Sequence, residues 1–469
     1  MKQIFNKHFF LLALAVFVSA MLFQGCKEDK QSRMKVLKIY NWADYIDEEL
    51  LTEFPKWYKK QTGENVKIVY QVFDMTEVMY TKIALGKEDF DLVCPTQAII
   101  QRMMHNNLLL PIEQNIGQGT MYFDNISPFI RQRLDAFSLP GKTAADYVVP
   151  YMWGTSGIMY NTGLVSAEEV NSWGCFWNPE NKGKMLMKDS YWDVYNVASV
   201  YGNYQQIAQD KRTLYDVANA HTPADIQLVE QKIKEMRPYI AGWEADFGKE
   251  MMTRGEIWFT YAWNGDAVWA IEEAAAVGVS LDYVVPKEGS NIWFDGWVIP
   301  KYAQNTKAAS YFLAYICQSD VALRNMDVCG YSSAVATPEV AEAQTNDEIT
   351  GTSNLRYFFG AGYENMHINP IQYPDSIVVA RCAIINDFLD KNETVLEMWS
   401  RAKGDSMNVG MAVFIFGIFF VLAVWLLYQR IKRFRKRKRF IGKGFWFTVS
   451  ASSQIVHPFL PIQQKLPTR

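Results

Sequence analysis

Short apolar stretches with a period of two recur along the chain from about position 35. Residues 35–41 (KVLKIYN) and 66–73 (VKIVYQVF) alternate apolar with polar side chains, and residues 90–95 (FDLVCP) form a compact apolar run. Alternation of this kind puts every second side chain on one face of an extended segment. The pattern therefore predicts three strands.

Between these strands the apolar positions recur at helical spacing instead. Residues 47–63 and 74–86 both have this spacing, the second begins at a capping Asp74, and both end at a glycine, which favours helix termination. Pro55 lies inside the first segment and predicts a kink or a break there. Strands that alternate with helices in this way indicate βαβ units, a parallel sheet and an α/β fold class.

Two later stretches are typical of crossings between two lobes. Residues 147–161 (YVVPYMWGTSGIMYN) form a long extended segment with internal glycines, and residues 281–300 (LDYVVPKEGSNIWFDGWVIP) predict a pair of strands. Helical and mixed segments lie between them, and a mostly helical remainder runs to about Ala402. The pattern predicts two lobes that the chain connects twice.

The first residues carry an export signal. A basic start and an apolar run at 9–22 precede Cys26, which predicts a signal peptide at 1–25, lipidation of Cys26 and a polar leader at 26–34. Phe23 departs from the usual small aliphatic residue of a lipidation motif. A transmembrane anchor is the weaker alternative, because the apolar run is short for a bilayer.

A second apolar run lies near the other end. Residues 409–428 contain no charged side chain, and about 20 such residues are enough for one transmembrane helix, with a buried core helix as the weaker alternative. The block at 430–439 is strongly basic, so the positive-inside rule places a tail at 429–469 in the cytoplasm and the preceding chain on the periplasmic side of the inner membrane. Beside a span, such a block more often binds anionic lipid than nucleic acid.

The chain without this tail has a strongly negative net charge. Residues 1–408 contain 36 Lys and Arg against 50 Asp and Glu, a net charge of −14. An acidic surface favours encounter with a cationic ligand.

The five cysteines after Cys26 lack paired spacing, which argues against a disulfide framework.

Aromatic rings occur beside carboxylates at several segment junctions. Trp263 precedes Asp266, Trp293 precedes Asp295, and Asp193 follows two further rings. Ring faces attract an ammonium group, and carboxylates accept charge-assisted hydrogen bonds from it. Any one pair is more often core plus surface than a ligand site, but their recurrence predicts a site for a cationic amine.

Three more candidates follow predicted strands directly. Trp42, Tyr45 and Thr96 lie just past strand ends. Ligands in open α/β sheets bind beyond the carboxyl ends of the strands. We therefore expect these side chains to line a binding crevice.

Enzymatic chemistry has weaker support. The five histidines are dispersed, and the sequence contains no HExxH, no P-loop, no GxGxxG after a strand and no GxSxG elbow. Paired carboxylates in an aromatic cleft also occur in glycosidases, so the residues leave that alternative open. We predict no enzyme, no metal and no cofactor.

Six segments together resemble the polyamine-binding family, the spermidine/putrescine-binding proteins that serve ABC importers. They are IYNWADYI, VFDMTEVMYTKIALGKEDFDLVCPT, PYMWGTSGIMYN, AWNGDAVW, VVPKEGSNIWFDGWVIP and GYSSAVATP, in family order. The resemblance implies a two-lobed class II periplasmic binding protein fold with two hinge crossings. Residues 35–149 and 295–340 would form the N-terminal lobe, and residues 150–294 and 341–403 the C-terminal lobe.

The resemblance also implies roles for the aromatic candidates. Trp42 and Tyr45 would line the cleft. Trp263 and Trp293 would sandwich the aliphatic chain of the ligand, and Tyr331 would add a further wall. Among the polar candidates, the resemblance implies that Asp295 binds one amino end of the ligand. Asp193 stands where the family has Glu and would keep that role with a shorter reach. Family members also use a Gln from a late segment, for which Gln372 is the nearest match.

Other positions bear on the choice of polyamine. Ser190 stands where spermidine-type members have Asp, and Ala98 replaces an aromatic residue of some members. Asp266 resembles the acid of putrescine-type members, whereas Trp293 is the spermidine-type residue. The resemblance leaves the choice between putrescine and spermidine open, with a slight preference for putrescine or for broad polyamine binding.

The function that the resemblance implies is capture of a polyamine by closure of two lobes, in a monomer that delivers it to the permease subunits of an ABC transporter. Two alternatives remain. One is a receptor for a sugar or an iron chelate. The other is a membrane-tethered polyamine sensor, for which the tail of about 30 residues is short to form a folded signalling module.

Overall fold

The computed structural model describes residues 30–112, 122–136, 138–245 and 247–404, together with positions 417, 422, 425 and 428. The predicted signal peptide at 1–25, Cys26, most of the span at 409–428 and the tail at 429–469 lie outside these residues. Within the described part, none of the helices combines the length and the apolar character that a membrane crossing needs. The chain divides into two compact units, Met1–Lys403 and Gly404–Arg469, and the first carries the fold below.

The first three strands are those that the periodicity predicts. Strand β1 (Val36–Trp42) pairs in parallel with β2 (Lys67–Phe73) and with β3 (Leu92–Val93). Helices α3 (Glu48–Thr62) and α4 (Thr76–Ala84) provide the crossovers. The predicted βαβ units are therefore confirmed.

Helix boundaries follow capping chemistry. The Asp47 carboxylate accepts the Glu49 N–H at 3.0 Å at the start of α3, and Gly63 ends the helix with φ 76°. Of the two effects predicted for Pro55, the break was wrong, because α3 continues through it, and the kink stays a prediction. The predicted Asp74 cap was also wrong, since Met75 is the N-cap of α4 and makes no side-chain cap.

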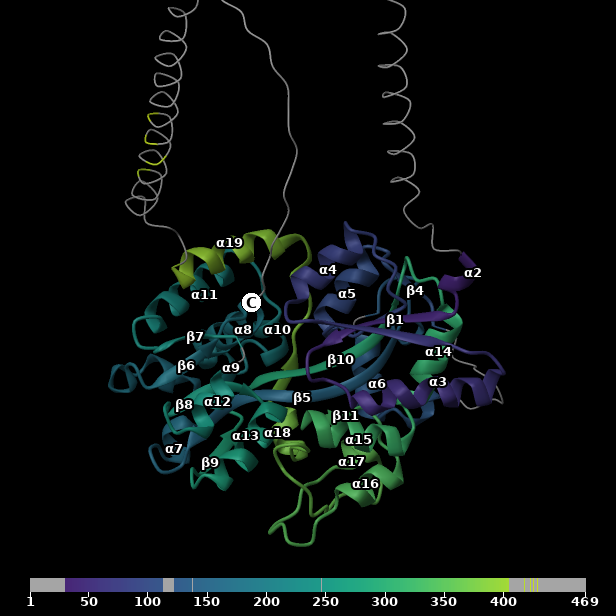
Figure 1. Ribbon diagram of the computed structural model, residues 1–469. Helices are drawn as coiled ribbons and strands as arrows, with labels where there is room; N and C mark the ends of the chain where they lie inside the picture. Colours follow the sequence, from purple (N-terminus) through teal and green to yellow (C-terminus); the bar gives the residue numbers. More distant parts are fainter. Residues whose placement is uncertain are drawn as a thin grey trace, which may run out of the picture. The chain divides into compact units, whose positions relative to one another are not determined.

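Two long strands occupy the middle of the sheet. Strands β5 (Val148–Asn161) and β10 (Ser290–Pro300) are antiparallel neighbours in the order β2-β1-β3-β10-β5-β8-β6-β7. Figure 1 shows them running between the elements around β1 and those around β6 (Met185–Lys188). The predicted parallel pairing therefore holds for β1 to β3. The sheet as a whole is mixed, because β10 runs antiparallel to β3, and β5 runs antiparallel to β8 (Phe259–Trp263).

The remaining strands belong to the same sheet, and further helices connect them. The strands are β4 (Leu109–Leu110), β7 (Gly242–Glu244), β9 (Leu281–Val284), β11 (Ser332–Ser333) and β12 (Cys382–Ile384). The helices are α2 (Lys30–Arg33), α5 (Gln97–His105), α6 (Pro128–Ala136), α7 (Ala167–Val170), α8 (Tyr191–Gly202), α9 (Tyr204–Ala208), α10 (Leu214–Ala218), α11 (Pro223–Met236), α12 (Gly248–Thr253), α13 (Asn264–Ala276), α14 (Thr306–Ile316), α15 (Ser319–Cys329), α16 (Pro338–Gln344), α17 (Arg356–Phe359), α18 (Ser376–Ala380) and α19 (Asn392–Lys403).

The buried apolar side chains form two large clusters. One runs from Leu37 to Trp153 and again from Ile292 to Ile384. The other runs from Ile158 to Tyr261 and includes residues of α19. Strand β5 contributes to both, through Trp153 and Ile158. The lobe boundaries expected from the sequence stay a prediction.

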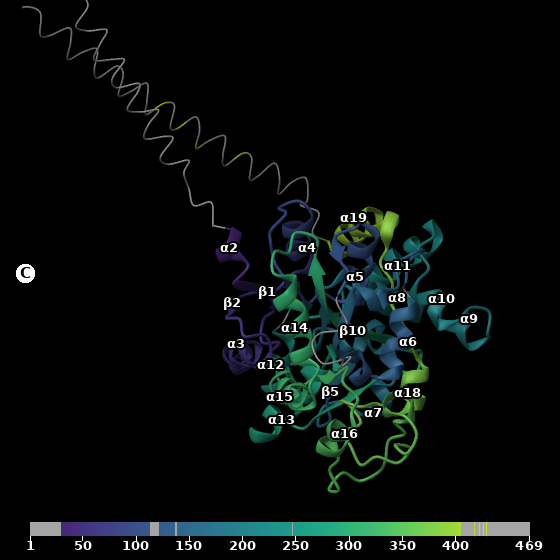
Figure 2. The ribbon, with the colours of Figure 1, turned by 90° about the vertical axis from the view of Figure 1, so that its right-hand side faces the viewer.

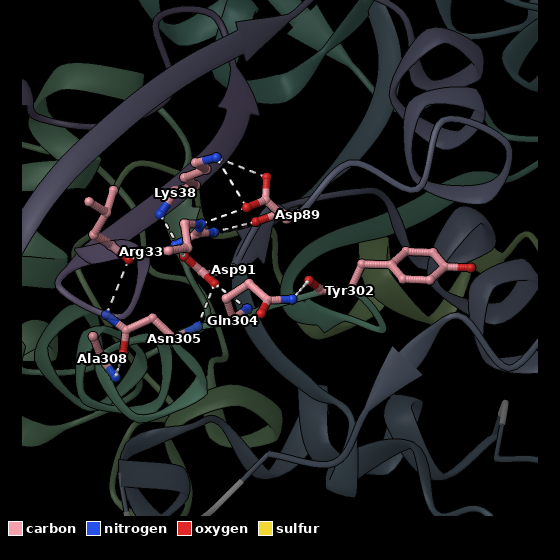
Figure 3. Close-up of polar contacts among 9 residues, drawn as sticks. Arg33, Lys38, Asp89, Asp91, Tyr302, Gln304, Asn305 and Ala308 are labelled. Atoms are coloured by element: carbon pink, nitrogen blue, oxygen red, sulfur yellow. Dashed lines mark hydrogen bonds and ion pairs between the residues drawn. The ribbon is translucent and has the colours of Figure 1, made fainter. Parts of the chain in front are cut away.

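A polar network fastens the start of the described chain to the sheet. The fully buried Asp91 carboxylate accepts the backbone N–H groups of Lys38, Gln304 and Asn305, each at 2.8 Å, and Arg33 Nη1 at 2.9 Å. Figure 3 shows Asp91 between these partners, and Figure 2 shows α2 beside β1 and β2. The network lies at the amino end of β1, away from the carboxyl end that carries Trp42.

Candidate functional site

The exit of β1 carries two of the predicted aromatic residues. Trp42 is the last residue of β1, and its ring packs on Phe73 with centroids 4.6 Å apart. Tyr45 follows a turn at Asp44, which has φ 50°, and is buried. The Trp42 Nε1–H and the Tyr45 hydroxyl are both buried without a hydrogen-bond partner among the described residues.

Asp295 reaches the same region from β10. The register of β10 against β5 shifts between Phe294 and Gly296, so Asp295 lies at a bulge, and it forms an isolated bridge with Thr96. A bulge turns a side chain away from the regular alternation of the strand. Asp295 is only 5% exposed, and its Oδ1 atom has no hydrogen-bond partner in the described part of the chain.

Burial sets the electrostatics of this pair. It raises the pKa of the Asp295 carboxyl to about 7, and the nearby Tyr45 hydroxyl opposes part of the rise. Burial also raises the pKa of the Tyr45 hydroxyl well above its usual value, and the Asp295 charge adds to that shift. A carboxyl held in this state gains from an incoming cation, which would stabilise its ionised form.

Tyr331 joins the two sides of the site. Its ring lies 5.7 Å from the Tyr45 ring and 5.3 Å from the Trp293 ring, centroid to centroid. Its hydroxyl donates to Asp266 Oδ1 at 3.0 Å. Gly265 permits this approach, because a Cβ atom there would lie 2.2 Å from the Tyr331 ring. Four predicted site residues are therefore contiguous.

The two tryptophans flank β5. Trp293 pairs with Gly154, and Trp263, at the end of β8, pairs with Ser156. Gly154 makes room for this arrangement, since a Cβ atom would lie 2.8 Å from Trp293 Cζ2. Trp293 is buried and Trp263 partly buried.

The start of α8 contributes a second buried acid. Ser190 is the N-cap, and its hydroxyl accepts the Asp193 N–H at 3.4 Å. The Asp193 carboxylate accepts a short hydrogen bond from the Tyr261 hydroxyl. Burial raises the pKa of the Asp193 carboxyl, and the Tyr261 hydrogen bond opposes the rise.

Gln372 lies beside the Tyr331 segment rather than among the rings. Its Nε2 donates to the Gly330 carbonyl at 3.1 Å, and its own carbonyl accepts from the Ser332 hydroxyl at 2.6 Å. These bonds brace the segment on both sides of Tyr331. Among the described residues, no hydrogen bond, ion pair or ring contact joins Gln372 or Trp42 directly to Asp295 or Trp293. Their predicted ligand contacts therefore stay predictions.

Two lysines of the site were missed by sequence reasoning. Lys188 Nζ lies 4.1 Å from the Trp263 ring centroid and 3.1 Å from Glu244 Oε1. Lys249 Nζ lies 3.9 Å from Asp266 Oδ1. The only local signal was a lysine at the end of the apolar strand MLMK, a pattern that also fits an ordinary strand terminus.

The surface beside Tyr45 is hollowed. The hollow has a volume of about 460 Å³ and is lined by residues 43–48, Tyr70, Val72 and Val328. Three of its lining residues are acidic. Across the described part of the chain, no group of three or more His, Cys, Asp or Glu side chains is arranged to hold a metal ion.

Comparison with known proteins agrees with this architecture. A family profile described as bacterial extracellular solute-binding protein matches residues 55–352, which is more than half of the chain. The chain belongs to this family. As a solute-binding protein, it is grouped with transport proteins and not with enzymes.

Two relatives of this solute-binding protein have named ligands. The spermidine/putrescine-binding periplasmic protein of Escherichia coli K12 is 28% identical over 316 residues, covering 66% of this chain and 82% of the relative. The putrescine-binding periplasmic protein SpuD of Pseudomonas aeruginosa is 29% identical over 334 residues, covering 67% and 82%. The predicted resemblance to this family is confirmed.

A solved structure shares the fold. The spermidine/putrescine ABC transporter substrate-binding protein PotD of Streptococcus pneumoniae superposes with a TM-score of 0.57 at 26% identity, over 79% of this chain and 99% of that one. The solute-binding protein therefore has the α/β periplasmic binding protein fold that was predicted. The transmembrane helix expected at 409–428 lies mostly outside the described residues.

Proposed function

We propose that this protein is the periplasmic receptor of a polyamine ABC importer, which captures putrescine or spermidine and presents it to the permease subunits. The observation that carries this proposal is the buried Asp295 carboxylate, which lies near Tyr45 and has an oxygen without a partner among the described residues. The Tyr45 ring contacts that of Tyr331, which in turn contacts that of Trp293. An ammonium group would satisfy the carboxylate, and the rings would cover the adjoining methylene groups. The named ligands of the relatives support the same class of solute.

In this proposal the ligand lies between two lobes that β5 and β10 connect. Asp295 and Thr96 are near one end, whereas Asp193 and Trp263 come from the elements around β6 and α8. A ligand with two separated charges interacts with both acids only when the lobes are closed, so ligand binding selects the closed form. The reaction is binding alone, and no bond of the ligand changes.

The proposal includes attachment to the inner membrane. The apolar residues 409–428 would span it once, the basic tail at 429–469 would face the cytoplasm, and a lipid on Cys26 would insert in the same membrane. Tethering a monomeric receptor beside its permease raises its effective concentration there.

Isothermal titration calorimetry on the purified full chain tests the function. We expect binding of putrescine, spermidine or both, and a loss of at least tenfold, about 1.4 kcal/mol, in Asp295→Ala. The matched control is Asp135→Asn, an exposed acid at the end of α6, which should bind as the wild type does. Binding of a sugar or an iron chelate in place of any polyamine would refute the proposal.

A further inference from the structure

One of the protein's own ammonium groups lies on a ring that is expected to hold the ligand. Lys188 ends β6, its side chain is 5% exposed, and its Nζ lies 4.1 Å from the Trp263 ring centroid. Glu244 Oε1 holds the same atom at 3.1 Å. One face of Trp263 is therefore already occupied by a cation.

The acids of the site divide into two groups. Glu244 is paired with Lys188, and Asp266 has Lys249 at 3.9 Å and the Tyr331 hydroxyl at 3.0 Å. The Asp193 carboxylate accepts a hydrogen bond from the Tyr261 hydroxyl, and the nearby charge of Lys188 favours its ionised form without an ion pair among the described residues. Asp295 Oδ1 has no hydrogen-bond partner in the part of the chain that the structure describes. Within the described residues, neither Asp193 nor Asp295 forms an ion pair with a Lys or Arg, so two carboxylates remain for ligand cations.

We infer that Lys188 is a specificity-determining residue that restricts the site to linear diamines and disfavours triamines. This inference rests on the proposed function. A diamine brings two ammonium groups for the two unpaired acids. A third ammonium group at the Trp263 end would lie beside Lys188, whose carboxylate partner is already engaged. Like charges repel, and a buried charge without a partner is strongly unfavourable.

Calorimetry with putrescine and spermidine on the full chain tests this inference. We expect the wild type to bind putrescine more tightly. In the double variant Lys188→Met/Glu244→Gln we expect the affinity for spermidine, relative to that for putrescine, to rise at least tenfold. Both charges are removed together because Lys188→Met alone would leave Glu244 buried without its partner and could unfold the chain. The double variant avoids this problem and therefore decides the test.

Lys184→Met is the matched control. Lys184 Nζ also lies over a tryptophan, 3.7 Å from the Trp258 ring centroid, but it contacts none of the candidate ligand residues among those described. The Lys184→Met variant should have the same ratio of spermidine affinity to putrescine affinity as the wild type. A double variant that melts like the wild type and keeps the wild-type ratio would overturn the role of Lys188. So would a wild type that prefers spermidine, although the receptor function would then stand. A chain that binds neither polyamine would overturn both.

Discussion

At the scale of single residues, Asp295 combines a bulge, deep burial and an unpartnered oxygen atom. If β10 alternated regularly along its whole length, the position of Asp295 would not differ from that of its neighbours. The bridge to Thr96 fixes its backbone, and burial makes its ionised form unfavourable until a cation arrives. In the proposed function, this residue would link ligand binding to protonation.

The first prediction concerns pH. Because the pKa of Asp295 is about 7 in the unliganded protein, the carboxyl is protonated below that pH and must release a proton to bind an ammonium group. We expect polyamine affinity to fall as pH decreases below 7, by up to tenfold per unit. Calorimetry in buffers of different ionisation enthalpy would detect the released proton.

The variant Asp295→Asn provides the control for this pH dependence. Its weaker binding should lose the part of the pH dependence that Asp295 causes, and the part that remains should come from Asp193, whose pKa is also raised by burial. The stability of the unliganded protein depends on pH in the opposite direction. A raised pKa means that the folded, unliganded chain holds a proton that the unfolded chain has lost, so this carboxyl makes stability fall as pH rises from about 4 to 7. An affinity that stayed constant below pH 7 in the wild type would contradict the role of Asp295.

At the scale of elements, the site depends on how closely β5 approaches its neighbours. Gly154 lies within β5, where a Cβ atom would be 1.9 Å from Asn264 Oδ1 and 2.8 Å from Trp293 Cζ2. Asn264 accepts the Thr155 N–H at 3.2 Å and donates to the Ile371 carbonyl at 3.0 Å, so it cannot move freely. The strand, α13 and Trp293 are thus packed as one unit.

Gly154→Ala should accordingly damage both stability and binding. Overpacking of this kind costs about 1–3 kcal/mol, which thermal unfolding would show as a lower melting temperature, and calorimetry should show weaker polyamine binding because Trp293 is displaced. Gly242→Ala in β7 is the control, since its new Cβ atom would meet only Leu186 Cδ2, at 3.8 Å. Equal melting temperatures for the two variants would contradict this packing argument.

At the scale of the whole molecule, the network around Asp91 connects the fold to its proposed attachment. Arg33 follows Cys26 by seven residues and is held by Asp89 and Asp91. A lipid on Cys26 would therefore keep the amino end of β1 within about 25 Å of the membrane surface, the reach of seven extended residues.

Membrane fractionation tests the two proposed anchors. We expect Cys26→Ser to remain in the membrane fraction, because the span at 409–428 still holds it. Truncation after Gly404 should also remain if Cys26 carries a lipid. The variant with both changes should become soluble. If the Cys26→Ser variant left the membrane fraction, the span would be disproved. If the variant with both changes stayed in the membrane fraction, the two anchors would not account for the attachment.

Local patterns in the sequence determined much of this molecule. The two periodicities predict β1 to β3 with α3 and α4, and the extended segments at 147–161 and 281–300 predict β5, β9 and β10, because the buried face of an element repeats with its own backbone geometry. Local patterns also identified most aromatic and acidic residues of the site as chemical types, whereas Tyr331 was named only by the resemblance to the polyamine-binding family.

The tertiary structure alone decided how these residues meet. Tyr45, Trp293 and Tyr331 come from distant parts of the chain, and only the strand order and the bulge at Asp295 bring them to one place. Local periodicity contains no information on which strands become neighbours, and it therefore missed Lys188 on the ring of Trp263. Pairing across the sheet is a long-range property, and in this protein it determines which acids remain available to a ligand.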